Sequence, residues 1–258
     1  MLLIIEALLL ILAALGQDHR AAVEGKIAPL DMAPNSADDQ YKGCRENMAN
    51  LVETEYLNKE IAAFKTFWQR GADYVREPKD DLKKNNLIAI YVYTDYGVYD
   101  DLKYAVYNDK EKYKDKTFTW YSLHFLLTEA IQILKRLQNK CYDTYRGTKD
   151  TYIYDDKDKE VRFGYFTSSS LDRSRTPFFG TKTCFKIHTC EGADITKYSK
   201  LPREKEVLIP PYEKFKVTAV KNRADQPDLW CETVFTLKSS GKTSELNCAV
   251  APKDTAKL

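Results

Sequence analysis

The chain has few of the residues on which common cofactor, metal and hydrolase sites depend. Only 10 of its 258 residues are glycine, and no Gly-x-Gly-x-x-Gly follows an expected strand, which argues against a Rossmann site or a phosphate loop. No serine lies in a Gly-x-Ser-x-Gly elbow, so a serine hydrolase has little support. There are three histidines and no Cys-x-x-Cys, so the usual ligand clusters of a zinc site are missing. Two of the histidines, His124 and His188, lie in patterns typical of packing or surface residues, and we do not expect them to be catalytic.

The charge balance also excludes one class of partner. The chain has 40 basic and 38 acidic residues, which are interspersed and leave a formal net charge of +2. A nucleic-acid-binding surface needs basic residues in marked excess over acidic ones. We therefore expect no nucleic-acid partner.

A single long apolar run, residues 1–16, begins the chain. It is shorter than the roughly 20 apolar residues that span a bilayer, and small residues end it at Ala14-Leu15-Gly16, so we expect a signal peptide over 1–16. A buried N-terminal helix is the alternative, because Glu6 interrupts the run and no Lys or Arg precedes it. No second apolar segment follows, so a membrane span or lipid-anchor tail is not expected. Six cysteines behind such a segment indicate a secreted, disulfide-bonded protein, with residues 17–258 as one domain.

The hydrophobic pattern changes along the chain from helical to strand-like. Apolar residues recur at helical spacing over 56–74 and 120–137, and the continuous apolar run Leu87–Tyr93 is expected to be a short buried strand. After Cys141 short alternating segments separated by turn residues predict antiparallel strands. These segments are 151–154, 161–166, 183–189, 206–209, 215–220 and 233–237. Helices first and strands later predict an α+β fold.

Three short segments combine residues that suit a nucleotide site. Arg146 is followed by Gly147, so a guanidinium that can bind phosphate adjoins a backbone that a ligand can approach closely. Ser168 belongs to a run of three serines after an aromatic strand; a serine turn or helix cap is the alternative. Glu204 and Glu206 lie two residues apart before an apolar strand, where an extended backbone would project both carboxylates to one face. Each segment alone also fits an ordinary surface turn or solvated edge strand.

Taken in order, the Arg, the Ser-rich strand and the Glu-x-Glu resemble the vertebrate secreted and cell-surface arginine-specific mono-ADP-ribosyltransferases. The resemblance includes Tyr145-Arg146-Gly147-Thr148, Phe166-Thr167-Ser168-Ser169-Ser170 and Glu206-Val207-Leu208-Ile209-Pro210-Pro211-Tyr212. It implies helices packed on an antiparallel β-sandwich with an NAD cleft. It also implies transfer of ADP-ribose from NAD to arginine on acceptor proteins, with no metal. For the cysteines it implies the pairs Cys44 with Cys248 and Cys141 with Cys190, which leaves Cys184 with Cys231.

The resemblance also gives each site residue a role. Glu206 would stabilise the positive charge that develops on the ribose, and Glu204 would orient the acceptor guanidinium and take its proton. Arg146 would hold the NAD phosphates, Ser168 would orient Glu206 and the ribose, and Gly147 would let the backbone meet the nicotinamide amide. The basic segment 197–203, where the family presents its acceptor-recognition surface, leaves the acceptor undetermined. An NAD glycohydrolase on the same scaffold, or a catalytically silent secreted binding protein, are the alternatives.

Overall fold

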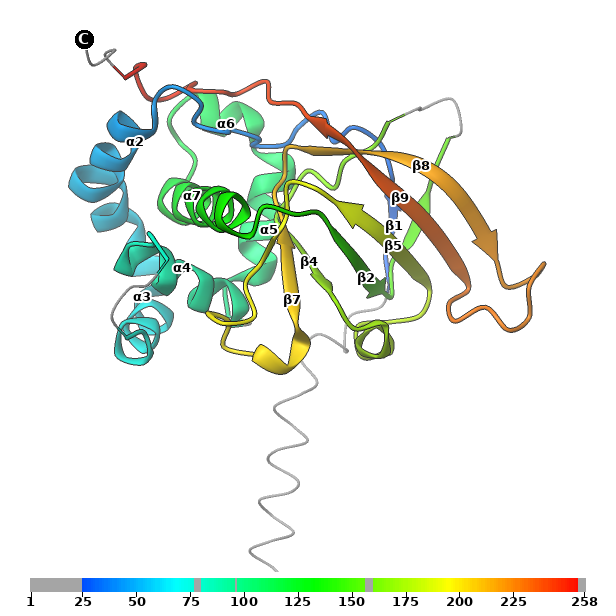
Figure 1. Ribbon diagram of the computed structural model, residues 1–258. Coiled ribbons are helices and arrows are strands. Elements are labelled where there is room, and N and C mark those ends of the chain that lie inside the picture. Colours follow the sequence, from blue (N-terminus) through cyan, green and yellow to red (C-terminus); the bar gives the residue numbers. More distant parts are fainter. Residues whose placement is uncertain (1–24, 77–79, 96, 156–159, 255–258) are drawn as a thin grey trace, which may run out of the picture.

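The computed structural model describes residues 25–76, 80–95, 97–155 and 160–254, and the predicted signal peptide lies outside these ranges. The helices gather on one side of the molecule and most strands on the other (Figure 1). The α+β prediction is therefore confirmed, with the helices mainly in the N-terminal half.

Among the described residues, seven helical segments form the helical part. Helix α3 and helix α7 agree with the two predicted helices to within a residue at each end, and the π-helix η1 leads directly into α3. Helix α7 packs against α4, α3 and strand β6, so it lies where the helical part meets the sheet. The segments are α2 (Arg45–Leu51), η1 (Val52–Tyr56), α3 (Leu57–Tyr74), α4 (Lys84–Thr94), α5 (Tyr99–Asn108), α6 (Lys110–Lys114) and α7 (Tyr121–Gln138).

Helix α4 corrects the prediction of a strand over Leu87–Tyr93. Every residue from Asn86 to Thr94 is buried, so no polar face marks the 3.6-residue period. An apolar run of this length is compatible with either a buried strand or a buried helix, and periodicity cannot separate them. The Asn86 side chain accepts a hydrogen bond from the backbone N–H of Lys83 at 2.9 Å, which caps the first turn and favours the helix.

Seven strands form one sheet in the order β6-β7-β4-β2-β5-β9-β8, in which the pair β5 and β9 is parallel and the other pairs are antiparallel. Strands β5, β7, β8 and β9 match the strands predicted over 183–189, 206–209, 215–220 and 233–237. A parallel pair, β1 (Ile27–Pro29) and β3 (Thr151–Ile153), lies apart from this sheet. The strands of the sheet are β2 (Tyr142–Thr148), β4 (Thr167–Ser170), β5 (Thr183–Thr189), β6 (Ala193–Asp194), β7 (Glu206–Ile209), β8 (Glu213–Asn222) and β9 (Thr233–Lys242).

The strand predicted over 161–166 is wrong: only Val161 forms a bridge, with Phe215, and strand β4 begins at Thr167. Gly164 has a φ of +70°, which breaks an extended backbone. Arg162 turns inward to an ion pair with Asp38 at 2.5 Å, and both side chains are almost completely buried. Contacts with residues distant in sequence therefore determine the conformation of this segment, and the alternation of apolar and polar residues gives no sign of them.

Three disulfides join the parts of the chain, and they are the predicted ones. Cys44–Cys248 ties the start of α2 to the C-terminal segment. Cys141–Cys190 connects the residue before β2 to the residue after β5, and Cys184–Cys231 connects β5 to the segment before β9.

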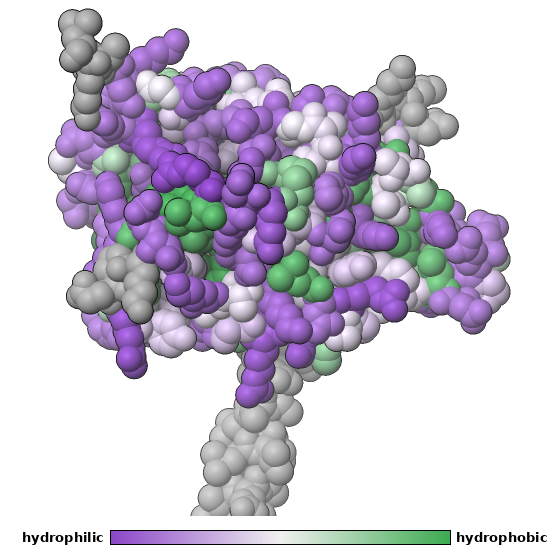
Figure 2. Space-filling model, viewed as in Figure 1, coloured by the Kyte–Doolittle hydropathy of each residue, from purple (hydrophilic) through white to green (hydrophobic). Residues whose placement is uncertain are grey.

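The face seen in Figure 2 is largely hydrophilic, with small apolar patches. Within the described ranges, no helix combines the length and the apolar character needed to cross a membrane.

His124 of α7 is buried and belongs to a chain of polar groups, which agrees with the packing role predicted for it. Its Nε2 lies 2.8 Å from the carbonyl of Ala37, which can only accept, so Nε2 carries the proton and Nδ1 accepts from the Tyr41 hydroxyl at 2.6 Å. The Tyr113 hydroxyl lies 3.0 Å from both the Tyr41 hydroxyl and Asp39 Oδ2. Burial lowers the pKa of His124 to about 4 and raises the pKa of Asp39 to about 6.

These two shifts predict opposite effects of pH on stability. The folded-state pKa of His124 lies below its ordinary value of 6.5, so its stabilisation is complete above pH 6.5 and is lost as the pH falls towards 4. Asp39 contributes stability that is present below pH 3.8 and is lost as the pH rises through 6. We expect His124→Gln to gain about 3 kcal/mol relative to the natural protein when the pH falls from 6.5 to 4. Urea unfolding at several pH values measures this gain, and parallel stability curves for the two proteins would contradict it.

Candidate active site

The five residues predicted for the site line one cleft at the edge where β2, β4 and β7 lie side by side. Arg146 and Gly147 come from β2, Ser168 comes from β4, and Glu206 begins β7. Glu204 precedes β7 and lines the same cleft. The cleft is therefore assembled from three neighbouring strands that are distant in sequence.

The Arg146 side chain extends from β2 and forms hydrogen bonds with residues of β4 and α5. Its Nη1 donates to the carbonyl of Ser168 at 2.7 Å, and its Nη2 donates to the Tyr99 hydroxyl at 3.3 Å. Its Nε is buried and has no hydrogen-bond partner among the described residues. A fixed guanidinium with a spare donor beside a cleft suits an anionic group of a ligand.

Gly147 is required by close packing. A Cβ at this position would lie 2.4 Å from the carbonyl oxygen of Gly180 and 2.5 Å from that of Thr176. These carbonyls belong to the 3-10 helix η2 (Arg173–Phe178) and the residues that follow it. Gly147 thus allows this segment to pack closely against β2. The sequence had instead predicted that the glycine lets a ligand approach the backbone.

Ser168 has its hydroxyl proton committed to a buried tyrosine. The Tyr93 hydroxyl donates its single proton to the carbonyl of Phe166 at 2.9 Å. The contact of 3.0 Å between Tyr93 and Ser168 Oγ must then use the proton of Ser168. Burial, more than the neighbouring Tyr99 and Glu206, raises the pKa of Tyr93 well above its ordinary value. Ser168 therefore offers hydrogen-bond acceptor capacity to the cleft.

Glu204 and Glu206 reach the cleft by a geometry that the sequence did not predict. Glu204 ends the 3-10 helix η3 (Pro202–Glu204), and Lys205 has a φ of +49° in the left-handed region, so the two glutamates do not lie on one extended strand. Ser170 anchors this turn, because its Oγ donates to the carbonyl of Glu204 at 2.6 Å. Glu206 is buried and Glu204 is only partly so. The turn thus places the two carboxylates in different environments within one cleft.

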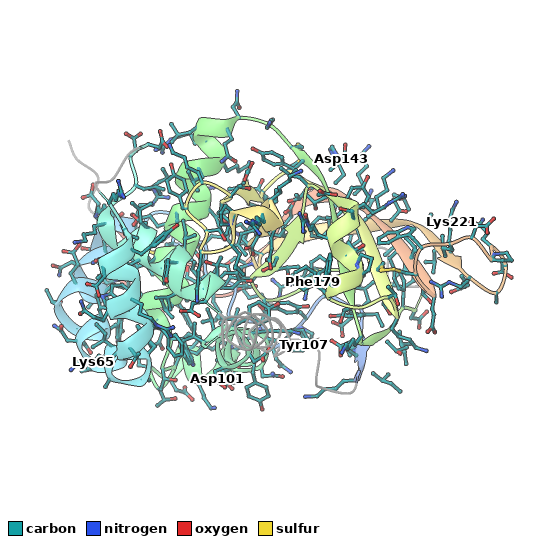
Figure 3. All side chains as sticks on the ribbon, turned by 90° about the horizontal axis from the view of Figure 1, so that it is seen from below. Lys65, Asp101, Tyr107, Asp143, Phe179 and Lys221 are labelled. Atoms are coloured by element: carbon teal, nitrogen blue, oxygen red, sulfur yellow. A yellow bond between two sulfur atoms is a disulfide. The ribbon has the colours of Figure 1, made fainter. Side chains whose placement is uncertain are left out.

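A larger cavity of about 680 Å³ continues from this cleft, and Arg146, Gly147 and Phe179 line both. Tyr107 and Phe179, labelled in Figure 3, both line the larger cavity. Lys103 of α5 also lines it, with its Nζ 4.8 Å from the ring centre of Tyr165. Interaction with Tyr165 raises the pKa of Lys103, so this side chain remains a cation. Together the two cavities form a continuous site whose lining includes the cations Arg146 and Lys103.

Several residues of the site were missed by the sequence prediction. Tyr93 lies in the segment taken for a strand, where its contact with Ser168 could not be foreseen. Tyr99 and Lys103 come from α5, which was not predicted. Phe179 follows η2, and no pattern in the sequence marks it. These residues surround the predicted ones, and only the tertiary fold brings them there.

Comparison with known proteins gives consistent matches. Residues 30–245 match the family model described as NAD:arginine ADP-ribosyltransferase. An erythroblast NAD(P)(+)–arginine ADP-ribosyltransferase of Gallus gallus is 36% identical over 85% of this chain and 75% of its own length. Ecto-ADP-ribosyltransferase 5 of Homo sapiens is 34% identical over 94% of this chain and 88% of its own. The crystal structure of the mono-ADP-ribosyltransferase ART2.2 superposes with a TM-score of 0.71 at 31% identity, covering 86% of this chain and 99% of the other.

Removing the Tyr93 hydroxyl should weaken both the fold and the placement of Ser168. Tyr93→Phe leaves the buried carbonyl of Phe166 and Ser168 Oγ without a partner, and we expect a loss of about 1–3 kcal/mol in the free energy of unfolding. Tyr74→Phe is the matched control, because the Tyr74 side chain is 56% exposed. Urea unfolding measures both variants, and equal stability for the two would contradict the assignment.

Proposed function

Because the chain belongs to the NAD:arginine ADP-ribosyltransferase family, we propose that it transfers ADP-ribose from NAD to arginine side chains of proteins and releases nicotinamide. One observation carries the proposal: Arg146, Ser168 and the Glu204/Glu206 pair come from three separate segments and line a single cleft. The cleft is continuous with a cavity large enough for the rest of a dinucleotide. NAD enters the reaction as a co-substrate.

Glu206 is proposed to stabilise the transition state of the first step. The bond between nicotinamide and the ribose breaks, nicotinamide leaves with the bonding electrons, and positive charge develops on the ribose as in glycoside cleavage. Glu206 is buried at the first position of β7, opposite Ser170 in the strand pairing, so its carboxylate is held in place before the charge appears. A preorganised negative group in a site of low polarity is an effective way to lower such a barrier.

Glu204 is proposed to act on the acceptor. A guanidinium has a pKa above about 12, so it must be oriented and lose a proton as its nitrogen bonds to the ribose. Glu204 ends the η3 turn and is partly exposed, which makes it accessible to a side chain of another protein. The proton passes to this carboxylate or to solvent as the new bond forms.

Arg146 and Lys103 are proposed to hold the NAD phosphates. Arg146 lines both cavities and keeps a buried, unused Nε donor among the described residues. Lys103 lines the larger cavity as a second cation. Ser168, as an acceptor in the cleft, suits a ribose hydroxyl. This arrangement needs no metal ion.

An extracellular or cell-surface location is proposed for the mature domain, residues 17–258, after loss of the signal peptide 1–16. The three disulfides support this location, because such bonds persist in oxidising compartments.

Ion pairs neutralise part of the positive charge of the segment 197–203, which lies beside Glu204. Lys197 forms an ion pair with Asp80 at 2.6 Å, and Lys200 forms one with Asp95 at 2.8 Å. The third basic residue near Glu204, Arg203, is exposed.

The test is incubation of the mature chain with NAD and agmatine, a small guanidino acceptor, followed by mass spectrometry. We expect ADP-ribosyl-agmatine from the natural protein and a loss of transfer of at least about a thousandfold in Glu206→Ala. Glu204→Ala should lose transfer to a similar extent while retaining cleavage of NAD by water, because only the acceptor step needs that carboxylate.

Glu53→Ala serves as the matched control, since Glu53 is exposed on η1 and lines neither the cleft nor the cavity that continues from it. Free ADP-ribose as the sole product of the natural protein would replace the transferase by an NAD glycohydrolase. Untouched NAD would instead indicate a binding protein that has kept the fold.

A further inference from the structure

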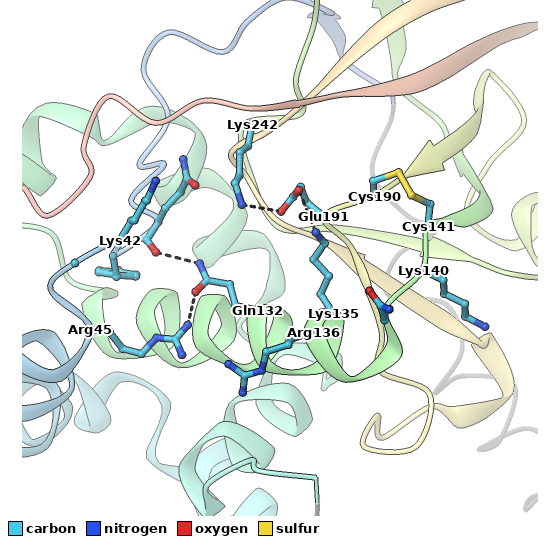
Figure 4. A pocket seen from close by; sticks show the side chains of 14 residues that line it. Lys42, Arg45, Gln132, Lys135, Arg136, Lys140, Cys141, Cys190, Glu191 and Lys242 are labelled. Atoms are coloured by element: carbon cyan, nitrogen blue, oxygen red, sulfur yellow. Dashed lines mark hydrogen bonds and ion pairs between the residues drawn. A yellow bond between two sulfur atoms is a disulfide. The ribbon is translucent and has the colours of Figure 1, made fainter.

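A second cavity, of about 810 Å³, lies where helix α7 ends, and it shares no lining residue with the transferase cleft. Figure 4 shows basic side chains around it from four separate parts of the fold. The loop before α2 contributes Lys42, α2 contributes Arg45, and β9 contributes Lys242. The remaining cations come from α7 and the residues after it: Lys135, Arg136 and Lys140.

The charge around this cavity departs strongly from that of the whole chain. Among the described residues, six basic residues and one acidic residue, Glu191, line it, so the formal charge of this lining is 6 − 1 = +5. The complete chain has 40 basic and 38 acidic residues. Because like charges that converge on one hollow repel each other, such an excess points to an anionic ligand.

Neighbouring acidic groups neutralise only part of this charge. Glu191 lies 3.2 Å from the Nζ of both Lys135 and Lys242, so one carboxylate serves two cations. Arg136 lies 3.9 Å from Asp81, and both of these side chains are more than 60% exposed, so solvent screens their attraction.

Three further cations lack even this compensation. Arg45 donates to the amide oxygen of Gln132 at 2.5 Å, and this neutral partner fixes the guanidinium without neutralising it. Lys140 lies over the ring of Tyr142 at 4.8 Å. Across the described ranges, no carboxylate lies within ion-pair distance of Lys42, Arg45 or Lys140.

Stabilisation of helix ends does not account for the cluster. Cations in the last turn of a helix interact favourably with its dipole, which explains Lys135 and Arg136 of α7. Arg45, however, is the first residue of α2, where the helix dipole disfavours a cation. Lys42 belongs to the loop before α2 and Lys242 to strand β9, so neither lies in the last turn of a helix. The convergence therefore needs another explanation.

We infer that this cavity binds a multiply sulfated oligosaccharide of the glycosaminoglycan class. Arginine binds sulfate in a bidentate manner and lysines add point charges, and the cavity volume lies in the range of about 300–1,000 Å³ that is usual for ligand sites. Tyr41, the one aromatic residue among the described lining residues, is 3% exposed, so this lining offers no platform for stacking nucleobases. Within the part of the chain that the structure describes, no exposed large apolar side chain lines the cavity, which argues against insertion into a membrane.

The extracellular location proposed above makes such glycans available, since they are the principal polyanions of cell surfaces. The inference does not depend on the transferase reaction, because the two sites share no lining residue. Binding of the glycan and transfer to agmatine can therefore succeed or fail separately.

Isothermal titration calorimetry of the mature chain with a fully sulfated heparin octasaccharide tests the inference. The same octasaccharide after desulfation is the ligand control. We expect binding at about 0.15 M salt that weakens as the salt concentration rises. The double variant Lys42→Glu with Lys140→Glu should lower the affinity at least about tenfold. The matched variant Lys65→Glu with Lys221→Glu changes the net charge equally at two exposed lysines that lie at opposite ends of the molecule in Figure 3, and it should stay within about twofold.

Unfolding of both double variants at the urea concentration that unfolds the natural protein establishes that each is folded, whether or not the protein transfers ADP-ribose. None of the four lysines lines the transferase cleft. Equal loss of affinity in the two double variants would reduce the effect to net charge and overturn the inference. Equal binding of the desulfated octasaccharide would also overturn it. Preferential binding to phosphatidylserine vesicles that depends on Lys42 and Lys140 would replace the glycan by a membrane surface.

Discussion

A buried ion pair between Arg162 and Asp38 holds together three parts of the chain on which the cleft depends. Arg162 lies just before β4, and its Nε also donates to the carbonyl of Met32 at 2.6 Å. Asp38 in turn accepts from the backbone N–H groups of Glu245 and Leu246, both at 3.0 Å. Removing one member of such a pair typically costs about 3–5 kcal/mol, because the other charge is left buried without compensation. The N-terminal loop, the entry to β4 and the C-terminal segment are thus fixed relative to one another.

The position of β4 then determines the site. This strand lies between β2 and β7 in the sheet, so Ser168 belongs to the strand between those that carry Arg146 and Glu206. The hydroxyl of Ser170 holds the η3 turn, and with it Glu204, against the same strand. Because sheet hydrogen bonds and a buried tyrosine support these side chains, little reorganisation is needed when charge develops in the cleft.

The sequence allowed prediction of those elements whose pattern is local. Helices α3 and α7 have one apolar face, and β5 alternates, so their periods identified them. The resemblance to a known family, which rests on the order of the arginine, serine and glutamate segments, grouped the four side chains that line one cleft. Helix α4 could not be assigned in this way, because it is buried on every side and shows no period.

The remaining differences arise from contacts between residues that are far apart in sequence. Arg162 belongs to an apparent strand, but its partner is 124 residues away, and the ion pair turns the backbone out of the sheet. The Glu-x-Glu segment was expected to be extended, whereas Lys205 adopts a left-handed conformation that only the surrounding fold requires. Tyr93 and Tyr99 complete the site from helices whose relation to the strands no short-range pattern encodes.

The Cys44–Cys248 bond has a consequence for the integrity of the protein outside the cell. It joins residues 204 positions apart, and the covalent ring that it closes contains β2, β4 and β7. A protease that cuts one exposed loop inside this ring opens it without releasing a fragment, because both new ends remain attached through the disulfide. The nicked protein would therefore keep its full mass until it is reduced, and the strands that form the cleft would remain parts of one molecule.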